Sequence, residues 1–533
     1  MRDPNPTILT PTEADDAGHR FIAARVLAHP DPARVGEFAP LFDANDGGTA
    51  TLSRESPDFR TPAGARSGPL ASARISRNQL LIQRLPGGLG LRYDAPSPGV
   101  EVNGRPLVKE LTLSTDELQA GIAVLLGRDL ALWIGWFEHI DTVAAVPGLI
   151  GEGTEMRRLR QQICILADLD VPVLLRGETG VGKELVAAAI HRHSKRSKGS
   201  YVAVNLAGVP PSMAASELFG HKRGAFTGAT EERRGYFAQA DGGTLFLDEI
   251  GDVGFDVQSL LLRAVQERVI QPVGGTTRQV DVRLIAATDS DLETAVARRE
   301  FREPLLRRFS CELRVPTLRA RREDVGLLFY HLLRGHLQKM GEEHRLERAG
   351  DGDEPFVPAP FVAALALHAW PGNVRELANV ALKFAVENRG RARGRAGEEL
   401  MRLITPRRAD AGAAATTPAI PAPPRSPGTP AAATAPPAVK RAEELSDAEL
   451  LEAFRAEAFS PERTARRLGL SKSYLYKRLR AHPEVARAHS IPAAEIRAVL
   501  RDCSGDVVTA AARLRISTRA LRLQLRRLDP TSA

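Results

Sequence analysis

The sequence predicts a multidomain protein: an all-β sandwich first, then an α/β unit followed by a helical segment, and last an all-α basic unit. Three observations predict this order. Short apolar runs broken by turns fill residues 20–140, apolar strands alternate with helical stretches from about residue 149, and two similar basic segments close the chain. At 533 residues the chain is also too long for a single hydrophobic core.

The composition is that of a globular protein with excess positive charge. Hydrophobic residues make up 43% and charged residues 26%, and the formal net charge is +8, which favours a polyanionic partner. The three cysteines, Cys164, Cys311 and Cys503, are scattered, so neither a disulfide framework nor a cysteine-based zinc site is expected. A reducing cytoplasm is the expected compartment.

Residues 20–140 are expected to form the β-sandwich, because their apolar runs are short and end in turns such as Asn103-Gly104. The most apolar stretch, Ile122 to Trp136, contains Arg128 and Asp129. It is therefore too short and too charged to cross a bilayer and is expected to form two buried strands around a turn. The polar, acidic start of the chain does not resemble a secretory signal, so no membrane partner is expected.

Residues 149–320 are expected to form a parallel sheet with helices on both faces. Apolar strands are predicted at 172–175, 201–204, 244–247 and 282–287, with helical stretches between them. Residues 321–390 continue as a helical segment, a lid, in which Pro371-Gly372 makes the turn that starts one helix.

A glycine-rich loop follows the first of these strands and opens a helix, which is the setting that a phosphate-binding loop requires. Its backbone N–H groups can cradle phosphate oxygens and its lysine can reach the β and γ groups, so ATP is the expected ligand. The generic pattern has Ser or Thr after the lysine as a magnesium ligand, and this chain has glutamate there. The loop consists of Gly177, Glu178, Thr179, Gly180, Val181, Gly182, Lys183 and Glu184.

Two acidic residues, Asp248 and Glu249, end the strand predicted at 244–247. They emerge at its carboxyl end, beside the expected position of the phosphates. Asp248 is expected to hold Mg²⁺ and Glu249 to polarise water. Without the phosphate-binding loop, such a pair would as often be a helix cap.

Between the loop and the acidic strand lies a hexapeptide bracketed by glycines, with one aromatic ring and one hydroxyl. Because glycine permits close backbone approach, Phe226 and Thr227 are expected at the tip of a loop. This loop is expected to move when the bound nucleotide changes and so to transmit the energy of ATP to a protein partner. The alternative is a turn that anchors Phe226 in a core. The hexapeptide consists of Gly224, Ala225, Phe226, Thr227, Gly228 and Ala229.

These motifs together resemble those of the bacterial enhancer-binding proteins, the AAA+ ATPases that activate sigma-54 RNA polymerase. The resemblance covers about residues 149–388, and its most specific part is the hexapeptide with Glu217 to His221 before it. It implies hydrolysis of ATP to ADP and phosphate with Mg²⁺ in a homo-oligomeric ring, expected to be hexameric. It also implies that Phe226 and Thr227 grip sigma-54 to remodel the closed promoter complex.

The resemblance implies roles for further residues. Asn205 would restrain the catalytic glutamate, Thr288 would sense the γ-phosphate, and Arg375, within Trp370 to Leu377, would touch ATP from the lid. Without the resemblance, Asn205 would be a polar strand cap and Arg375 part of an exposed helix pair.

Two arginines, Arg302 and Arg308, match those that reach into the nucleotide site of the neighbouring subunit, where a guanidinium stabilises charge on the transferred phosphoryl group. A solvated basic helix surface is the alternative. Asp289 stands where the family has asparagine and places an anion near a polyanionic ligand.

Residues 404–441, rich in alanine and proline, are expected to be a linker. Residues 441–533 contain 18 Lys plus Arg against 12 Asp plus Glu, which is +6 of the chain's +8. Residues 442–533 resemble two Fis-type helix-turn-helix units that bind double-stranded DNA at an upstream activating site. A basic oligomerisation module is the alternative. The expected DNA contacts are Ser471, Lys472, Tyr474, Lys477, Arg478, Ser517, Arg519, Arg522 and Arg526.

Three predicted loops of the sandwich look like those of a forkhead-associated domain, which reads phosphothreonine. Arg54 and Ser76 would contact the phosphate and Asn103 the peptide backbone. Gln79 and Ser53 depart from the histidine and glycine of that family. A non-binding sandwich, or one with a different ligand, is the alternative.

The combined hypothesis is a cytoplasmic, nucleoid-associated activator of sigma-54 RNA polymerase that receives a signal from a phosphothreonine protein or a Ser/Thr kinase. Two alternatives stay open. One is an AAA+ remodeller of another protein or of DNA, and the other is a passive DNA-binding repressor with a silent ATPase.

Overall fold

The structure of the chain, a computed structural model, describes residues 7–8, 20–43, 47–77, 79–93, 99–138, 146–226, 229–347, 354–404, 464, 493–503 and 513–514. The chain divides into two compact units, Met1–Thr416 and Thr417–Ala533. In the second unit the helix α16 is described, at Ala493–Asp502. The predicted linker and almost all of the two helix-turn-helix units lie outside the described residues. No helix within the described ranges is long and apolar enough to span a bilayer.

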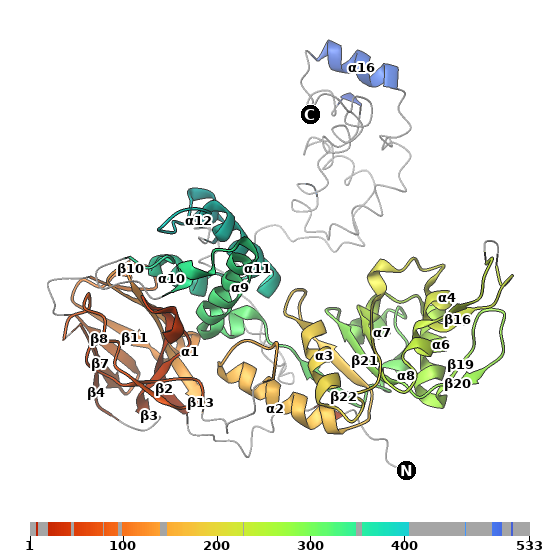
Figure 1. The fold of residues 1–533 in the computed structure, drawn as a ribbon, viewed down its shortest axis with the longest axis horizontal. Helices are drawn as coiled ribbons and strands as arrows, with labels where there is room; N and C mark the ends of the chain where they lie inside the picture. The colour runs from red at the N-terminus through yellow and green to blue at the C-terminus, as the bar shows by residue number, and fades with distance from the viewer. Residues whose placement is uncertain are drawn as a thin grey trace, which may run out of the picture. The chain divides into compact units, whose positions relative to one another are not determined.

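The first unit begins with two antiparallel sheets packed face to face (Figure 1). Ile122–Trp136 forms two buried antiparallel strands, as predicted. One sheet has the order β10-β9-β12-β13-β2-β3-β5-β6 and the other β11-β8-β7-β4. The elements are β2 (Arg20–Ala28), β3 (Phe38–Asp43), β4 (Thr49–Leu52), β5 (Phe59–Arg60), β6 (Arg66–Gly68), β7 (Leu80–Leu85), β8 (Gly88–Arg92), β9 (Val100–Val102), β10 (Arg105–Pro106), β11 (Glu110–Ser114), α1 (Thr115–Ala120), β12 (Ile122–Leu126) and β13 (Leu130–Glu138).

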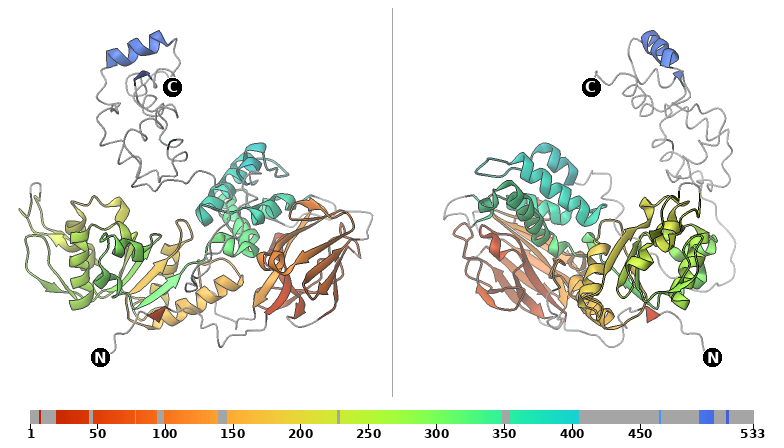
Figure 2. Two further views of the ribbon diagram at one scale, coloured as in Figure 1. Left: turned by 180° about the vertical axis from the view of Figure 1, so that it is seen from behind. Right: turned by 45° about the vertical axis from the view of Figure 1, so that its right-hand side comes forward.

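The α/β core follows, and its predicted parallel sheet with helices on both faces is confirmed (Figures 1 and 2). The sheet order is β1-β22-β14-β21-β18-β15, with α2 and α3 packed on one face and α4 to α8 on the other. The strands are β1 (Thr7–Ile8), β14 (Val173–Arg176), β15 (Tyr201–Asn205), β18 (Thr244–Asp248), β21 (Arg283–Thr288) and β22 (Cys311–Arg314), with short hairpin strands β16 (Gly220–His221), β17 (Arg233–Arg234), β19 (Val269–Ile270) and β20 (Arg278–Gln279). The helices are α2 (Thr154–Asp168), α3 (Lys183–His193), α4 (Ala214–Phe219), α5 (Tyr236–Gln239), α6 (Phe255–Glu267), α7 (Leu292–Ala297) and α8 (Glu303–Leu306).

A helical lid follows the core through a connector of two short 3-10 helices, Leu318–Ala320 and Arg322–Asp324. The lid helices are α9 (Val325–Met340), α10 (Ala359–Leu367), α11 (Asn373–Glu387) and α12 (Glu398–Ile404). Phe329, Phe361 and Phe384 pack ring against ring in its centre. The helices extend beyond the predicted end of the lid at residue 390.

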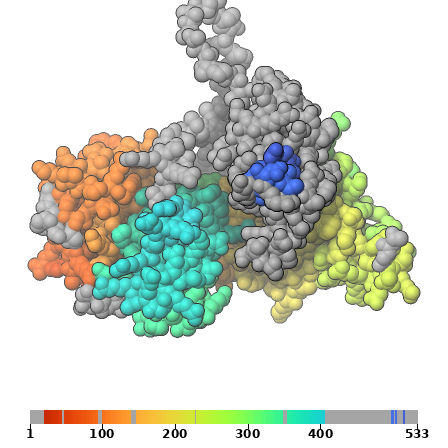
Figure 3. Space-filling model, turned by 90° about the horizontal axis from the view of Figure 1, so that it is seen from above, coloured from red at the N-terminus to blue at the C-terminus, as the bar shows by residue number. Residues whose placement is uncertain are grey.

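The lid and the sandwich share one hydrophobic core. Strand β2 is buried on both faces: Ile22 and Val26 point into the sandwich, whereas Ala23 and Leu27 join the cluster of the lid. Figure 3 shows the lid helices against the sandwich. Gly326 of α9 permits the contact, because a Cβ atom at this position would lie 2.3 Å from the backbone oxygen of Leu27.

A buried carboxylate also joins the parts of the first unit. Asp324 is fully buried and accepts hydrogen bonds from the backbone N–H groups of Glu152 and Gly153 at 2.7 and 2.8 Å. Arg25 of β2 pairs with it at 3.4 Å and donates to the carbonyl of Glu152 at 2.9 Å. Because Asp324 directly precedes α9, this side chain links the sandwich, the start of α2 and the lid.

The close contact of Gly326 predicts that glycine-to-alanine substitutions at two positions of α9 change the free energy of unfolding in opposite directions. Gly326→Ala should lower the free energy of unfolding by about 1 to 3 kcal/mol, because the new methyl group meets rigid backbone. Gly335→Ala should raise it by about 0.5 to 1 kcal/mol, since nothing lies within 4 Å of a Cβ atom there. Urea unfolding of both variants measures the difference, and a stabilised Gly326→Ala would contradict the close contact.

Candidate active site

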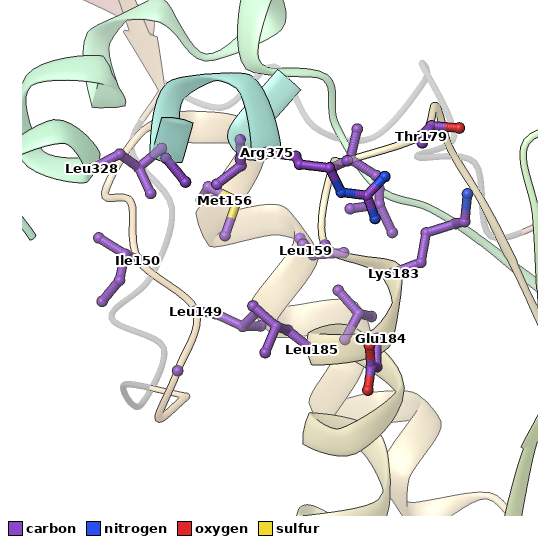
Figure 4. A pocket seen from close by; sticks show the side chains of 18 of the residues that line it. Leu149, Ile150, Met156, Leu159, Thr179, Lys183, Glu184, Leu185, Leu328 and Arg375 are labelled. Carbon is purple, nitrogen blue, oxygen red and sulfur yellow. The ribbon is translucent and has the colours of Figure 1, made fainter. Parts of the chain in front are cut away.

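A cavity of about 340 Å³ lies between the α/β core and the lid. Figure 4 shows Lys183 at the start of α3 and Arg375 from the lid in the same part of its wall. Apolar side chains, among them Leu149, Ile150 and Leu328, line another part. The predicted site residues that line the cavity are Thr179, Gly180, Val181, Gly182, Lys183, Glu184, Asp248, Glu249 and Arg375.

The predicted phosphate-binding loop runs from β14 into α3. Gly180 and Gly182 have φ angles of 83° and 103°, which favour glycine. The ammonium group of Lys183 donates to the carbonyl of Gly177 at 2.8 Å, so the loop closes around its own lysine. Lys183 is buried, and its ammonium lies 3.5 Å from Glu249.

The acidic pair lies at the carboxyl end of β18. Glu249 has a φ of 55°, a left-handed conformation that turns it away from the line of the strand. Burial raises the pKa of Glu249, Lys183 opposes this, and Asp289 and Asp248 add to it. A carboxylate with a raised pKa is suited to accept a proton from water.

The donor set fits a magnesium ion that shares its ligands with phosphates. Asp248 accepts weakly, from the Asn205 amide at 3.4 Å and from the backbone N–H of Glu249 at 3.2 Å. The described residues contain no cluster of three or more acidic, histidine or cysteine side chains able to hold a metal. Mg²⁺ typically uses one or two carboxylates together with phosphate oxygens and water, so Asp248 would be its protein ligand.

Asn205 and Thr288 end β15 and β21, the two strands that flank β18 in the sheet. Asn205 accepts a hydrogen bond from the backbone N–H of Ala207 at 3.0 Å, so it caps the following 3-10 turn, and its amide reaches Asp248. Its restraint on Glu249 stays a prediction. Thr288 is fully buried and accepts from the N–H of Ser290 at 3.0 Å.

Asp289 joins the phosphate-binding loop to the acidic pair. Its carboxylate accepts from the hydroxyl of Thr179 at 2.6 Å, and its backbone N–H lies 3.4 Å from the Glu249 carboxylate. The carboxylate that departs from the family pattern is therefore directed at the loop, and its charge acts on Glu249.

Two residues that were not predicted from the sequence tie the loop to the lid. Asn373, fully buried, donates to the Glu178 carboxylate at 3.0 Å and to the Thr179 carbonyl at 3.2 Å, and accepts from the Leu318 N–H at 2.9 Å. Arg319 forms a second contact with Glu178, and this hydrogen bond is the main reason that the pKa of Glu178 is lowered. An available signal was the Pro-Gly-Asn sequence, since asparagine tolerates the positive φ of 52° found here.

The two predicted arginine fingers do not line the cavity. Arg302 stacks on the Phe255 ring, 3.9 Å from its centre, and donates to the Phe255 carbonyl at 3.0 Å. Arg308 is exposed and has no side-chain partner in the described part of the chain. A contact with nucleotide would therefore have to involve another subunit.

The hexapeptide lies beyond the hairpin of β16 and β17. Phe226 is 42% exposed and meets the His221 ring edge-on at 5.0 Å, which argues against the alternative of a core anchor. Gly224 and Ala229 close the loop through a backbone hydrogen bond of 2.8 Å. Ala225 lies within this loop, whereas Thr227 and Gly228 lie outside the described residues.

In the sandwich, the backbone N–H of Arg54 donates to the backbone carbonyl of Ser76 at 3.3 Å, which brings two of the three predicted loops together. Asn103 accepts from the Ala123 N–H at 2.9 Å. Gln79 is fully buried and accepts from the Ser76 N–H at 2.8 Å. All nine predicted DNA-contacting residues, from Ser471 to Arg526, lie outside the described residues.

The segment around the cavity matches known families. Residues 149–313 match the sigma-54 interaction domain. Residues 319–393 match the AAA+ ATPase lid domain. The prediction of a sigma-54 interaction domain with an AAA+ lid is thus confirmed for this part of the chain, whereas the forkhead-associated and helix-turn-helix assignments fall outside the matched segments and stay predictions.

Relatives match the same central part. DctD of Rhizobium meliloti, a C4-dicarboxylate transport transcriptional regulatory protein, is 45% identical over 240 residues, which are 45% of this chain and 50% of DctD. The DNA-binding transcriptional regulator NtrC of Escherichia coli is 46% identical over 233 residues, 43% of this chain and 48% of NtrC. The chain therefore spans about half the length of these curated relatives.

A crystal structure of NtrX from Brucella abortus in complex with ATP is 28% identical to the chain. The alignment covers 63% of this chain and 69% of that one, with a TM-score of 0.41. This value is too low to support an argument about how the domains are arranged.

The contact between the phosphate-binding loop and the lid predicts that substitutions of two buried lid asparagines have different effects on nucleotide affinity. Asn373→Ala and Asn388→Ala should each lower the free energy of unfolding by about 2 to 4 kcal/mol, because each removes several buried hydrogen bonds. The Asn388 side chain bonds only to Phe384 and Arg395 of the lid among the described residues, so its loss should leave the affinity for a fluorescent ATP analogue unchanged. Asn373→Ala should weaken that affinity, and equal affinities would contradict a role of Asn373 at the site.

Proposed function

We propose that the chain is a sigma-54-dependent transcriptional activator that hydrolyses ATP to ADP and phosphate. The observation that carries the proposal is that Lys183, Glu249 and the lid residue Arg375 line the same cavity. Lys183 and Glu249 belong to the segment that matches the sigma-54 interaction domain. The exposed ring of Phe226 supports a protein partner for the hexapeptide.

The site residues suit attack of water on the γ-phosphorus. The loop N–H groups and Lys183 would hold the phosphates. Asp248 would hold Mg²⁺, which neutralises phosphate charge. Glu249 would accept the proton of the attacking water as the bond between the γ-phosphorus and the departing ADP breaks.

Contacts between loop and lid would report the state of the site. The hydrogen bonds of Asn373 to Glu178 and Thr179 connect the start of α11 to the phosphate-binding loop. Arg375 would touch the nucleotide from the same helix, and Thr288 would sense loss of the γ-phosphate. A change in the loop would then move the lid as one body.

A ring, expected to be hexameric, is part of the proposal. Arg302 and Arg308 would act on the nucleotide of the neighbouring subunit, which agrees with their positions outside this chain's own cavity. Movement in the ring would displace Phe226 and Thr227 against sigma-54 and remodel the closed promoter complex.

The outer domains supply the remaining parts of the hypothesis. The C-terminal units would bind an upstream DNA site, which places the protein at the nucleoid in the cytoplasm. The sandwich would receive a phosphothreonine signal at Arg54, Ser76 and Asn103. A remodeller of another protein or of DNA, and a passive repressor with a silent ATPase, are the two rival functions.

Two substitutions test the proposal against its rivals. Glu249→Gln should keep ATP binding and lower the ATPase rate by about 10²- to 10⁴-fold, because the proton acceptor is lost. Thr227→Ala should keep the ATPase rate and abolish open-complex formation by sigma-54 RNA polymerase on a supercoiled template. Full promoter opening by either variant would contradict the proposed coupling.

The pKa of Glu249 predicts the pH dependence of the ATPase. Glu249 must be deprotonated to accept a proton, so the rate should fall as the pH drops through its raised pKa. Asp289→Asn removes an anion that raises this pKa, so the acidic limb of the profile of kcat against pH should move to lower pH. Asp256→Asn, which removes an exposed carboxylate that is not among the charges shifting the pKa of Glu249, is the control. An acidic limb that moves to higher pH in Asp289→Asn would contradict this role of Asp289.

A further inference from the structure

A second cavity, which we name the junction cavity, lies where the sandwich, helix α2 and the connector to the lid meet. Its volume is about 490 Å³, within the range of sites for small organic molecules. None of the predicted site residues lines it. The lining residues are Arg20, Thr115, Gln119, Ala120, Gly121, Trp133, Gly135, Trp136, Glu138, Thr154, Glu155, Arg158, Arg319, Ala320, Arg322 and Glu323.

One cation of the junction cavity has no counterion among the described residues. Glu138 and Glu155 are paired with Arg20 and Arg158, and Arg319 is paired with Glu178 of the phosphate-binding loop. Arg322 is half-buried and has no hydrogen-bond or ion-pair partner among the residues that the structure describes. Burial, followed by the neighbouring Arg319 guanidinium, lowers the pKa of Arg322, as expected for a guanidinium without an anion beside it.

The acidic neighbour of Arg322 is directed elsewhere. The Glu323 carboxylate lies over Gly153 at the start of α2, where a Cβ atom on that glycine would be 2.3 Å from it. Burial, followed by the charge of Asp324, raises the pKa of Glu323, which reduces the negative charge it brings to the cavity. The charge of Arg322 is therefore left for a ligand.

The remaining wall is aromatic and contains hydrogen-bond donors. Two of the three tryptophans of the chain, Trp133 and Trp136, line the cavity. The Trp133 indole packs over Gly121, where a Cβ atom would lie 2.3 Å from the ring. The Trp133 indole N–H and the side chain of Gln119 have no hydrogen-bond partner in the described ranges. An aromatic wall beside one unpaired cation suits a flat ligand with a single anionic group.

We propose that the junction cavity binds a small aromatic anion, whose charged group pairs with Arg322 and whose ring packs against Trp136. Arg319, three residues before Arg322 on the connector, contacts Glu178. A bound anion would attract Arg319 away from Glu178 and weaken the contact of the lid with the phosphate-binding loop. This coupling rests on the proposed ATPase function, whereas the binding itself does not.

Tryptophan fluorescence tests the binding. Trp370→Phe removes the third tryptophan, so that emission comes from the two residues in the cavity. The probe is 3-phenylpropionate, with propionate as the anion without a ring and 3-phenylpropanol as the ring without a charge. We expect saturable quenching by 3-phenylpropionate with a Kd of about 0.1 to 1 mM.

Matched arginine variants localise the binding. Arg322→Ala should weaken binding of 3-phenylpropionate at least about tenfold, whereas Arg391→Ala, at an exposed lid position that does not line the cavity, should leave it unchanged. Equal binding to wild type and Arg322→Ala, or equal affinity for 3-phenylpropanol or propionate, would overturn the proposal, as would no binding at all. Isothermal titration of the chain with Trp370 intact gives the same comparison if Trp370→Phe does not fold.

The ATPase assay tests the coupling separately. Saturating 3-phenylpropionate should raise KM for ATP in the wild-type chain and should have no effect on Arg322→Ala. If the chain binds the probe but hydrolyses no ATP, the proposed function fails and the binding site stands. If ATP is hydrolysed and the probe does not bind, the junction cavity is not such a site and the proposed function is untouched.

Discussion

The buried carboxylate of Asp324 is the interaction on which the arrangement of the first unit depends. It receives the Arg25 guanidinium from the sandwich and two backbone N–H groups from the start of α2, while its own backbone leads into the lid. A buried pair of this kind adds little net stability when complete, but removal of one partner leaves an uncompensated charge at a cost of about 3 to 5 kcal/mol. The pair therefore selects one arrangement of sandwich, core and lid over looser ones. The close contact of Gly326 with Leu27 and the shared hydrophobic core act in the same direction.

The connector at residues 318–324 contacts the lid, the phosphate-binding loop and the sandwich. Its backbone at Leu318 is held by Asn373, Arg319 reaches the phosphate-binding loop, and Asp324 fixes the sandwich. Because these contacts are short and directional, the connector cannot change conformation without altering at least one of them. The sandwich is thereby connected to the phosphate-binding loop by contiguous contacts rather than through a flexible tether.

Local sequence patterns predicted the elements that depend on local chemistry. The phosphate-binding loop, the acidic strand end and the strands of the parallel sheet are each specified within about ten residues, because glycine conformation, helix termini and apolar runs are local properties. The contacts between Asn373 and Glu178 and between Arg25 and Asp324 join residues 195 and 299 positions apart. A single sequence contains no physical signal for such pairs, since they arise only when separate elements pack. Arg322, which has no partner in the described part of the chain, is equally hard to single out in a sequence where arginines are abundant.

The loops of the sandwich show how a departure from a family pattern can be accommodated. Gln79 is buried and holds the Ser76 backbone through its side-chain oxygen, so it braces this loop where the family has histidine. Asn103 braces β12 through the Ala123 N–H. Scaffold positions are thus occupied by side chains able to support a binding loop. The guanidinium of Arg54, which would receive the phosphate, is already paired. The Glu55 carboxylate lies 3.6 Å from Arg54 and 3.1 Å from Arg77. A phosphothreonine would have to displace this carboxylate from both guanidinium groups, so binding of the proposed phosphopeptide would depend on Glu55 as much as on Arg54.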